Sequence, residues 1–285
     1  MSTTPYAFSA FEHGRTDCTT PVCISHIGKR SNQEDNYLIN GLCLTSELQK
    51  QMSDNLCSVI NGTSPSKMHL YAVSDGMGGH NAGEVASRIC VEKLAAVEQE
   101  LQQYSSIKEA TAYLQTVIAE INDTVCDLSR KQNELKGMGA TLVVLVTCGT
   151  DCAILNVGDS RAYLFNNNVL IQITKDHTEG QRMLDLGLLT RKELSSFPAR
   201  KNLNRHIGYG QNGYVLRADE YYLALENGMI LLCSDGISDF LSDIRISEIL
   251  CSESNLEIAA KQLIDEAVTA HNADNATAVL IPIRR

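Results

Sequence analysis

Apolar residues recur at three- and four-residue intervals along two long stretches in the first half of the chain. The stretches run from Ala86 to Leu101 and from Ile107 to Leu128, and they predict two amphipathic helices that each bury one face. Only a short polar turn separates them, so we expect the helices to pack against each other antiparallel. The same spacing predicts a third long helix over residues 256–270.

Elsewhere the apolar residues form short runs bounded by turn residues, and these runs predict β-strands. The expected strands lie at 22–24, 37–39, 70–73, 142–146, 153–157, 162–165, 169–173, 221–225, 229–233 and 278–283. Four of them follow one another between residues 142 and 173 without a helix, which predicts an antiparallel meander. Residues 166–168 are all asparagine and predict a hairpin loop, and Thr190 with Glu193 predicts a capping box at a short helix.

Together these elements predict an α+β fold, a sandwich with sheets inside and helices outside. Residues 1–20 are small and polar, so we expect a flexible N-terminal arm ahead of a single domain over residues 21–285. Residues 40–67 lack periodicity and are interpreted as an excursion between two strands. Residues 176–212 are also less regular.

Composition narrows the possible functions. The chain has 285 residues and a net charge of −10, with no long basic run, which argues against a nucleic-acid-binding surface. No apolar run is long enough to span a bilayer, and the first twenty residues lack the features of a signal peptide. Ten cysteines occur without a CxxC pair, so we expect free thiols in a reducing cytoplasm. We also expect a monomer without nucleic-acid or membrane partners.

Carboxylate residues stand where several of the expected strands meet turns. They occur in Glu34-Asp35, Asp75-Gly76, Ser234-Asp235-Gly236 and Asp274-Asn275. Mg²⁺ and Mn²⁺ prefer oxygen ligands, and glycines beside an aspartate let backbone carbonyls approach an ion. Each motif alone also fits an ordinary turn, but their joint occurrence predicts a metal-dependent hydrolase.

Two further residues, Arg30 and Asp159, bear on this interpretation. A guanidinium binds phosphate oxygens as a bidentate donor, so Arg30 is a candidate phosphate ligand. The alternative is a surface cation in a basic turn with Lys29. Asp159 lies in a tight turn between two strands, and we expect it to be structural, holding backbone amides or Arg161.

Seven segments, in this order, resemble the signatures of the type 2C (PPM family) metal-dependent protein serine/threonine phosphatases. They are residues 28–36, 75–84, 137–141, 157–161, 174–177, 232–236 and 274–277. The match covers about residues 22–283, nearly the whole chain. Met77, directly after the Asp-Gly pair, is similar to the bacterial branch.

The resemblance implies a four-layer αββα sandwich, with two mainly antiparallel central sheets flanked by helix pairs. It implies hydrolysis of phosphoserine and phosphothreonine in proteins, reversing Ser/Thr kinase signalling, by a binuclear Mg²⁺ or Mn²⁺ centre that activates water. The implied metal ligands are Glu34, Asp35, Asp75, Gly76, Asp235 and Asp274. Asp75 would bridge the two ions and Arg30 would bind the substrate phosphate, so these two are the implied catalytic residues.

Within that set, Asp235 and Asp274 would complete one ion, and Glu34 and Asp35 would hold the other. Animal members commonly carry a histidine, proposed as the general acid, where this chain has Met77, so no general acid is assigned. Some bacterial members hold a third ion through an acid where this chain has Lys136 and Gly137. A third ion therefore stays open unless Asp123 or Asp127 reaches the centre.

Two other functions are compatible with the residues. One is a binding or regulatory relative that keeps the fold without catalysis, and the other is a phosphohydrolase of small molecules. Degenerate relatives usually lose a metal acid, whereas this chain has every one, which favours an active phosphoprotein phosphatase. The family resemblance places a mobile flap at residues 176–212, where specificity for one substrate class would lie.

Overall fold

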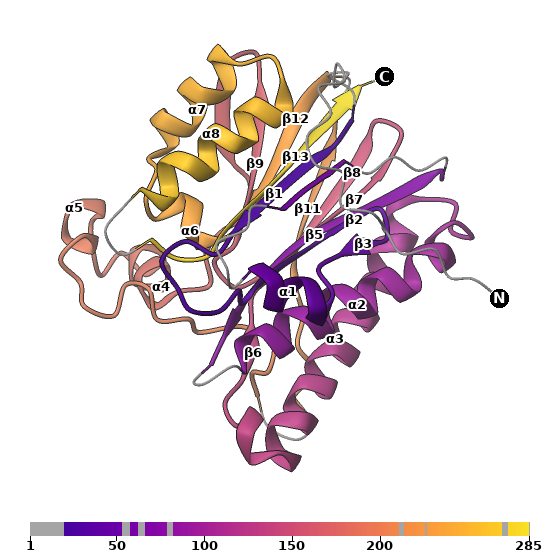
Figure 1. Cartoon of the computed structure of the whole chain (residues 1–285), viewed down its shortest axis with the longest axis vertical. Helices are drawn as coiled ribbons and strands as arrows, with labels where there is room; N and C mark the ends of the chain where they lie inside the picture. The colour runs from indigo at the N-terminus through magenta and orange to yellow at the C-terminus, as the bar shows by residue number, and fades with distance from the viewer. Residues whose placement is uncertain are drawn as a thin grey trace.

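The structure is a computed structural model that describes residues 20–52, 58–61, 66–78, 82–210, 214–225, 227–269 and 273–284. The expected N-terminal arm therefore lies, apart from its last residue, outside the described residues. Two antiparallel sheets face each other in the centre of the molecule (Figure 1). Helices cover the outer face of each sheet, so the expected α+β sandwich is confirmed.

The first sheet has the strand order β10-β9-β12-β13-β1-β4, and the second has the order β11-β8-β7-β5-β2-β3, with β6 paired to β5. The strands are β1 (Val22–His26), β2 (Asp35–Ile39), β3 (Leu42–Cys43), β4 (Ser58–Asn61), β5 (Met68–Met77), β6 (Gly139–Ala140), β7 (Leu142–Cys148), β8 (Asp151–Val157), β9 (Arg161–Asn166), β10 (Val169–Gln172), β11 (Asp219–Ala224), β12 (Asn227–Cys233) and β13 (Ala276–Arg284).

Helices form the two outer layers. They are α1 (Ser46–Met52), α2 (Gly83–Leu101), α3 (Ile107–Lys131), α4 (Glu179–Asp185), α5 (Arg191–Leu194), α6 (Asp235–Ser238), α7 (Asp243–Ser252) and α8 (Leu256–Val268), with a 3-10 turn, η1, at Asn133–Leu135. The α2–α3 pair buries its apolar faces against β5, β7 and β8. The α7–α8 pair covers the other sheet, and the sequence pattern had predicted only its second member.

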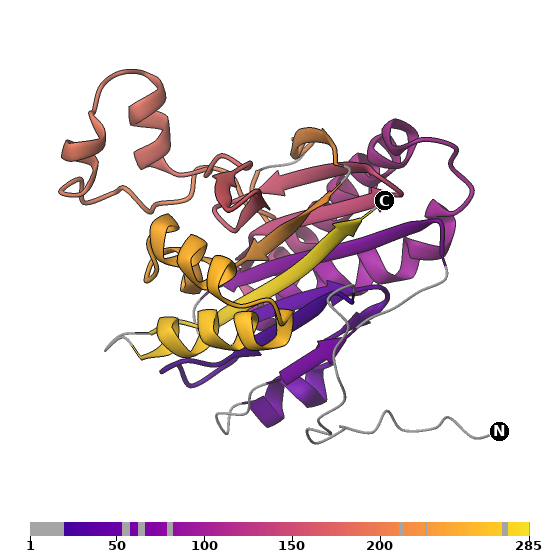
Figure 2. The ribbon, with the colours of Figure 1, turned by 90° about the horizontal axis from the view of Figure 1, so that it is seen from above.

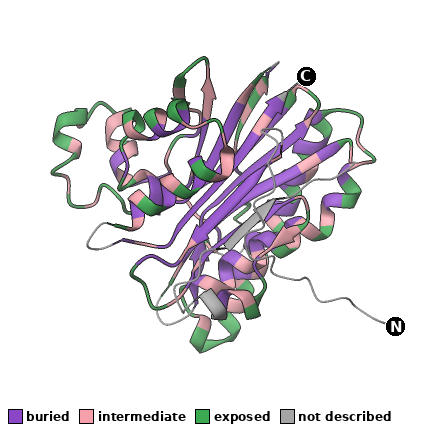
Figure 3. Ribbon diagram, turned by 45° about the horizontal axis from the view of Figure 1, so that its top comes forward, coloured by how far each residue is buried: buried purple, intermediate pink, exposed green. Residues whose placement is uncertain are grey.

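Three apolar clusters hold these layers together. One lies under α2 and α3, one lies under α7 and α8, and the third fills the space between the sheets. The central strands are buried on both faces (Figure 3), which is why they appear in the sequence as continuous apolar runs rather than as alternating patterns. Tyr37 and Tyr163 are the largest fully buried side chains among the described residues, and Tyr37 lies in the inter-sheet cluster.

The prediction of one continuous meander was wrong. Strands β7 and β8 pair in one sheet, whereas β9 and β10 pair in the other, because the chain crosses between sheets at the turn that follows β8. Gly158 in this turn has φ +107°, and a Cβ there would lie 2.7 Å from the Thr141 side chain. The hairpin prediction is confirmed, since Asn167 and Asn168 adopt positive φ angles of 50° and 61°.

The two segments without a periodic apolar pattern differ in the structure. The segment 40–67 contains β3, α1 and β4, and β4 forms an edge strand paired to β1. The second segment, which we call the flap (residues 176–212), connects β10 to β11. Its described part contains α4 and α5 and projects from the sandwich as a separate lobe (salmon in Figure 2). The predicted capping box of Thr190 and Glu193 opens α5.

Candidate active site

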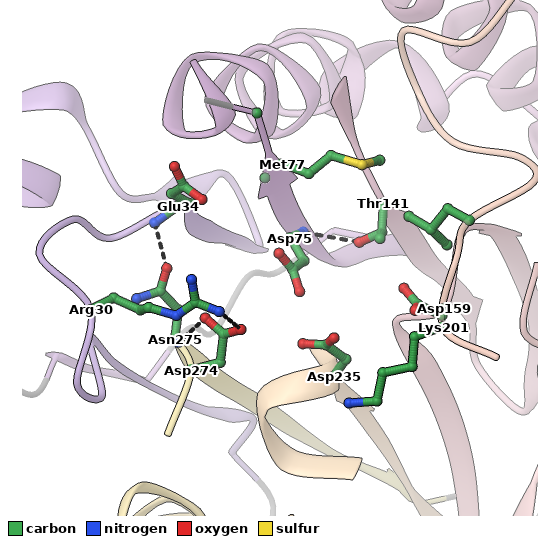
Figure 4. Close-up of a pocket in the computed structure, with 13 residues that line it drawn as sticks. Arg30, Glu34, Asp75, Met77, Thr141, Asp159, Lys201, Asp235, Asp274 and Asn275 are labelled. Carbon is green, nitrogen blue, oxygen red and sulfur yellow. Dashed lines mark hydrogen bonds and ion pairs between the residues drawn. The ribbon is translucent and has the colours of Figure 1, made fainter. Parts of the chain in front are cut away.

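Acidic side chains from both sheets meet in one pocket. Asp75 lies near the end of β5, Asp235 begins α6 directly after β12, and Asp274 precedes β13 (Figure 4). The pocket has a volume of about 310 Å³. Its lining residues are Arg30, Glu34, Asp75, Gly76, Met77, Gly78, Thr141, Asp159, Lys201, Leu203, Asp235, Asp274 and Asn275. The pocket therefore contains every candidate residue from the sequence except Asp35.

Asp35 lies beneath the pocket. It pairs with Asp75 in the register of β2 and β5, and its side chain is fully buried. The Oδ2 atom of Asp35 accepts hydrogen bonds from the hydroxyls of Ser234 and Thr277, both at 2.7 Å. Its Oδ1 atom is buried without a hydrogen-bond partner among the described residues. A buried carboxylate oxygen without a donor is costly, so this atom calls for a cation or an ordered water.

A chain of hydroxyl and amide groups continues below Asp35. Thr277 Oγ1 lies 2.8 Å from Ser25 Oγ, which accepts a hydrogen bond from the side-chain amide of Gln33 at 2.8 Å. All of these groups are buried. The network links β1, β2 and β13, and so it fixes the carboxylate of Asp35 relative to both sheets.

The loop that carries Arg30 is held to the end of β13 by Asn275. The side-chain amide of Asn275 donates to the backbone carbonyls of Ile27 (2.8 Å) and Asn32 (3.0 Å), and its Oδ1 accepts from the backbone N–H of Glu34 (2.8 Å). Arg30 itself is exposed over the pocket and forms an ion pair with Asp274. Its guanidinium therefore lies at the mouth, where an incoming anion would meet it first.

Glycines allow the loops of the pocket to approach each other closely. A Cβ at Gly76 would lie 2.1 Å from the backbone oxygen of Gly83, and a Cβ at Gly236 would lie 1.8 Å from that of Asn275. Both distances are far below van der Waals contact. Any other residue at these two positions would push the strand ends apart and separate the carboxylates that they carry.

The crowded carboxylates perturb one another. Burial raises the pKa of Asp35 to about 7 and that of Asp235 to about 6, and neighbouring aspartates add to both shifts. Burial and the charge of Asp35 raise the pKa of Asp75 well above its ordinary value. Burial also raises the pKa of Glu34. Like charges gathered this closely require positive countercharge at neutral pH.

Divalent cations fit this donor set. The set contains carboxylates, a backbone carbonyl at Gly76 and the unpartnered Oδ1 of Asp35, all of them oxygen donors of the kind that Mg²⁺ and Mn²⁺ prefer. Among the described residues, no three acidic, His or Cys side chains already converge on one point. Side-chain rotations of the half-buried Asp75, Asp235 and Asp274 would therefore have to complete a coordination sphere.

Two pocket residues were missed or misjudged from the sequence. Asp159 lines the pocket, and burial together with the charge of Asp235 raises its pKa to about 8. Of its two expected roles, holding Arg161 is wrong, because Arg161 binds Asp176 through bonds of 2.7 and 2.9 Å, and holding backbone amides stays a prediction. Lys201 comes from the flap, and no motif had pointed to it. Asp159 could have been found because it follows a buried strand, as the other acids do.

The middle motif, at Lys136 and Gly137, was a possible source of a ligand for a third ion. Lys136 and Gly137 are exposed and do not line the described pocket. Asp127 is exposed on α3 and forms ion pairs with Arg130 and Lys131, and Asp123 is not a lining residue of the pocket either.

Comparison with known proteins identifies the family. The model of the family described as protein phosphatase 2C matches residues 60–271. A serine/threonine phosphatase stp from Listeria monocytogenes serotype 4b is 34% identical over 213 residues, which cover 74% of this chain and 83% of that protein. The family match contains Asp75 and Asp235, whereas Arg30, Glu34 and Asp274 lie outside its limits.

Solved structures show the same fold. The serine/threonine phosphatase Stp1 from Staphylococcus aureus superposes with a TM-score of 0.77 at 28% identity, covering 96% of this chain and all of that one. The catalytic domain of the phosphatase PstP, solved in complex with two manganese ions, superposes with a TM-score of 0.70 at 27% identity, covering 93% of this chain and all of that domain.

In the part of the chain that the structure describes, no helix is long and apolar enough to cross a membrane. The family model, the curated relative and the solved structures agree with the acid-lined pocket between the two sheets. The chain is therefore a bacterial-type serine/threonine protein phosphatase of the protein phosphatase 2C family.

Proposed function

We propose that the pocket described above hydrolyses phosphoserine and phosphothreonine in proteins with the help of two Mg²⁺ or Mn²⁺ ions. The observation that carries this proposal is the convergence of acidic side chains from both sheets beneath an exposed arginine. The acids would otherwise repel one another, and the arginine sits where a phosphoryl group would enter. Phosphorylated proteins, made by a Ser/Thr kinase, would be the partners.

We assign Asp75 as the bridge between the two ions, with the Gly76 carbonyl on one of them. Asp235 and Asp274 would complete one ion, and Glu34 and Asp35 would hold the other, Asp35 through the Oδ1 atom that lacks a hydrogen-bond partner among the described residues. Divalent ions bound there supply positive charge to phosphoryl oxygens and lower the pKa of bound water to near neutrality. The manganese-bound PstP domain supports a count of two.

The chain's own residues perform the remaining tasks. Arg30 would donate two N–H groups to phosphoryl oxygens, since its guanidinium is exposed over the acids. Asn275 would position Arg30 over the pocket through its three hydrogen bonds to the Ile27–Glu34 loop. Ser234 and Thr277 would keep the carboxylate of Asp35 ionised and correctly oriented.

The site draws on residues from Arg30 to Asp274, at opposite ends of the sequence. Strand β13 pairs with β1 in the first sheet, and β2 pairs with β5 in the second. We therefore propose that residues 21–285 act as one catalytic domain. Truncation at either end of this range would remove a ligand or the strand that positions it.

A direct test measures phosphate release from a phosphothreonine peptide by wild type and by Asp235→Asn. We expect turnover that requires Mn²⁺, stops with EDTA and falls at least a hundredfold in the variant, because one ion loses a charged ligand. Asp151→Asn is the matched control, since Asp151 is exposed at the start of β8 and should change nothing. Turnover that survives both EDTA and Asp235→Asn would rule the proposal out.

A further inference from the structure

The flap is a cationic surface on an acidic protein. Residues 176–212 contain six Lys or Arg and four Asp or Glu, whereas the whole chain has a net charge of −10. The flap also reaches the active site directly, because Lys201 and Leu203 line the pocket. A positively charged lobe beside a phosphate-binding pocket raises the question of which partner it would bind.

The acids of the flap are already engaged with other groups. Asp176 binds Arg161, Glu179 binds Arg182 and Asp185 binds Lys175. The fourth acid, Glu193, is committed to the capping box at the start of α5. Among the described residues, none of these carboxylates forms an ion pair with Arg191, Lys192 or Arg200.

Three cations of the flap remain uncompensated. Arg191 and Lys192 are exposed on the first turn of α5, and Arg200 is exposed shortly after it. Among the described residues, none of the three forms an ion pair with an acidic side chain. Lys201, the next residue, lines the pocket and is compensated by an ion pair with Asp239.

Contacts within the flap keep these cations on one lobe. The backbone carbonyl of Arg200 accepts a hydrogen bond from the N–H of Gly180 (3.2 Å). A Cβ at Gly180 would lie 2.6 Å from this carbonyl and 2.7 Å from Leu194 of α5. Thus α5 and Arg200 both pack on the start of α4, in the lobe whose returning segment carries Lys201 and Leu203 to the pocket (Figure 2).

We propose that the flap docks an acidic segment next to the phosphorylated residue of the substrate protein, through Arg191, Lys192 and Arg200. The inference rests on the proposed phosphatase function and specifies its substrate class. Complementary charge favours this occupant, because carboxylates of a substrate can pair with guanidinium and ammonium groups that the protein leaves unpaired. Two exposed leucines, Leu186 (57%) and Leu188 (65%), offer apolar contact on the same lobe.

The test compares three phosphothreonine peptides whose three flanking residues on each side are all Glu, all Gln or all Lys. The variant is Arg191→Glu/Lys192→Glu. Acids are favourable at the first turn of a helix, so the variant should fold normally. The control is Lys67→Glu/Lys108→Glu, which changes the net charge equally. Lys67 and Lys108 are exposed, and Lys67 lies about 26 Å from Asp75 along the strand direction of β5.

Wild type should have the lowest KM for the Glu peptide. The flap variant should raise this KM about tenfold, equivalent to 1.4 kcal/mol, at unchanged kcat, and should leave the KM for the Gln peptide unchanged. The effect should shrink as salt rises from 50 to 300 mM, because exposed charges are screened over about 10 Å at 0.1 M. The control should behave as wild type. An unchanged Glu-to-Gln ratio in the flap variant, or an equal change in the control, would overturn the inference.

A binding measurement keeps the inference separate from catalysis. Fluorescence anisotropy of a labelled Glu peptide in EDTA should show weaker binding to the flap variant than to the control. If wild type releases no phosphate from any peptide, the proposed function fails while this measurement still tests the flap. A labelled single-stranded RNA of twenty nucleotides is the competing ligand, and tighter binding of the RNA than of the Glu peptide would overturn the assignment to an acidic protein segment.

Discussion

In the absence of divalent ions, the free energy of unfolding should fall as the pH rises. Asp35 should be a main cause of this fall. Burial raises the pKa of Asp35 from 3.8 to about 7 in the folded protein. The folded state therefore holds a proton between these pH values that the unfolded chain has released. The free energy of unfolding falls as the pH rises through this window, and the stabilisation is lost above pH 7.

The magnitude follows from the two pKa values. At 1.36 kcal/mol per pH unit, the difference is worth about 4 kcal/mol in total, of which about 3 kcal/mol is lost between pH 5 and 8. Urea unfolding in EDTA measures this loss of stability. Far-ultraviolet circular dichroism detects the unfolding, because the chain lacks Trp. With a slope of about 3 kcal/mol per molar urea, the midpoint should fall by about 1 M from Asp35 alone.

Asp35→Asn isolates this contribution, because the amide keeps the size of the side chain and an oxygen that can accept from Ser234 and Thr277. Between pH 5 and 8, the urea midpoint of the variant should fall by about 1 M less than that of wild type. Mn²⁺ added at pH 8 should restore wild type more than the variant, since an ion replaces the lost proton. Equal pH slopes for the two proteins in EDTA would refute the account of Asp35.

Three further predictions concern the architecture of the pocket. Arg30→Ala should raise KM for a phosphopeptide at least tenfold with little change in kcat, because a charge-assisted contact is worth about 1.5–3 kcal/mol; a large fall in kcat at constant KM would contradict ground-state binding. Thr277→Val should raise the Mn²⁺ concentration for half-maximal activity about tenfold or more by removing a donor to Asp35, measured by Mn²⁺ titration at pH 7. Gly236→Ala should lower the melting temperature measured by circular dichroism and abolish activity, since the new methyl group would overlap the Asn275 carbonyl; a variant with wild-type melting would contradict this packing.

Local patterns were enough to predict most helices and strands, because their periods depend on neighbouring residues alone. The two long helices end within a few residues of their predicted limits, and the capping box is present. Helix α7 was missed, because it is only ten residues long and buries only Ile246, Ile249 and Leu250. The sheet to which each strand belongs was not predictable, because β8 and β9 are adjacent in sequence and separate at Gly158.

The acids of the site were predictable because each follows or precedes a buried strand, and strand ends in a sandwich converge. The groups that hold these acids in place were not predictable. Ser25 meets Thr277 across 252 positions of the chain, and no local signal pairs two hydroxyl residues at that distance. Lys201 reaches the pocket only because the segment that returns from the flap lobe passes along it (Figure 2). Such contacts depend on tertiary packing, which residue spacing does not encode.

The same arrangement that makes the pocket chemically useful also makes it unstable without cations. Glycines at positions 76 and 236 let the strand ends approach, and the approach brings the carboxylates of Asp75 and Asp235 into one pocket. Replacing these glycines would separate the acids and relieve their repulsion, but it would also remove the site. The carboxyl pKa values in the pocket are therefore raised, and repulsion between the ionised carboxylates destabilises the folded protein at neutral pH. Ions that bind only the folded state offset this destabilisation. Stability at neutral pH and the capacity for catalysis thus depend on the same countercharge, so variants that weaken ion binding while keeping every carboxylate should lose both together.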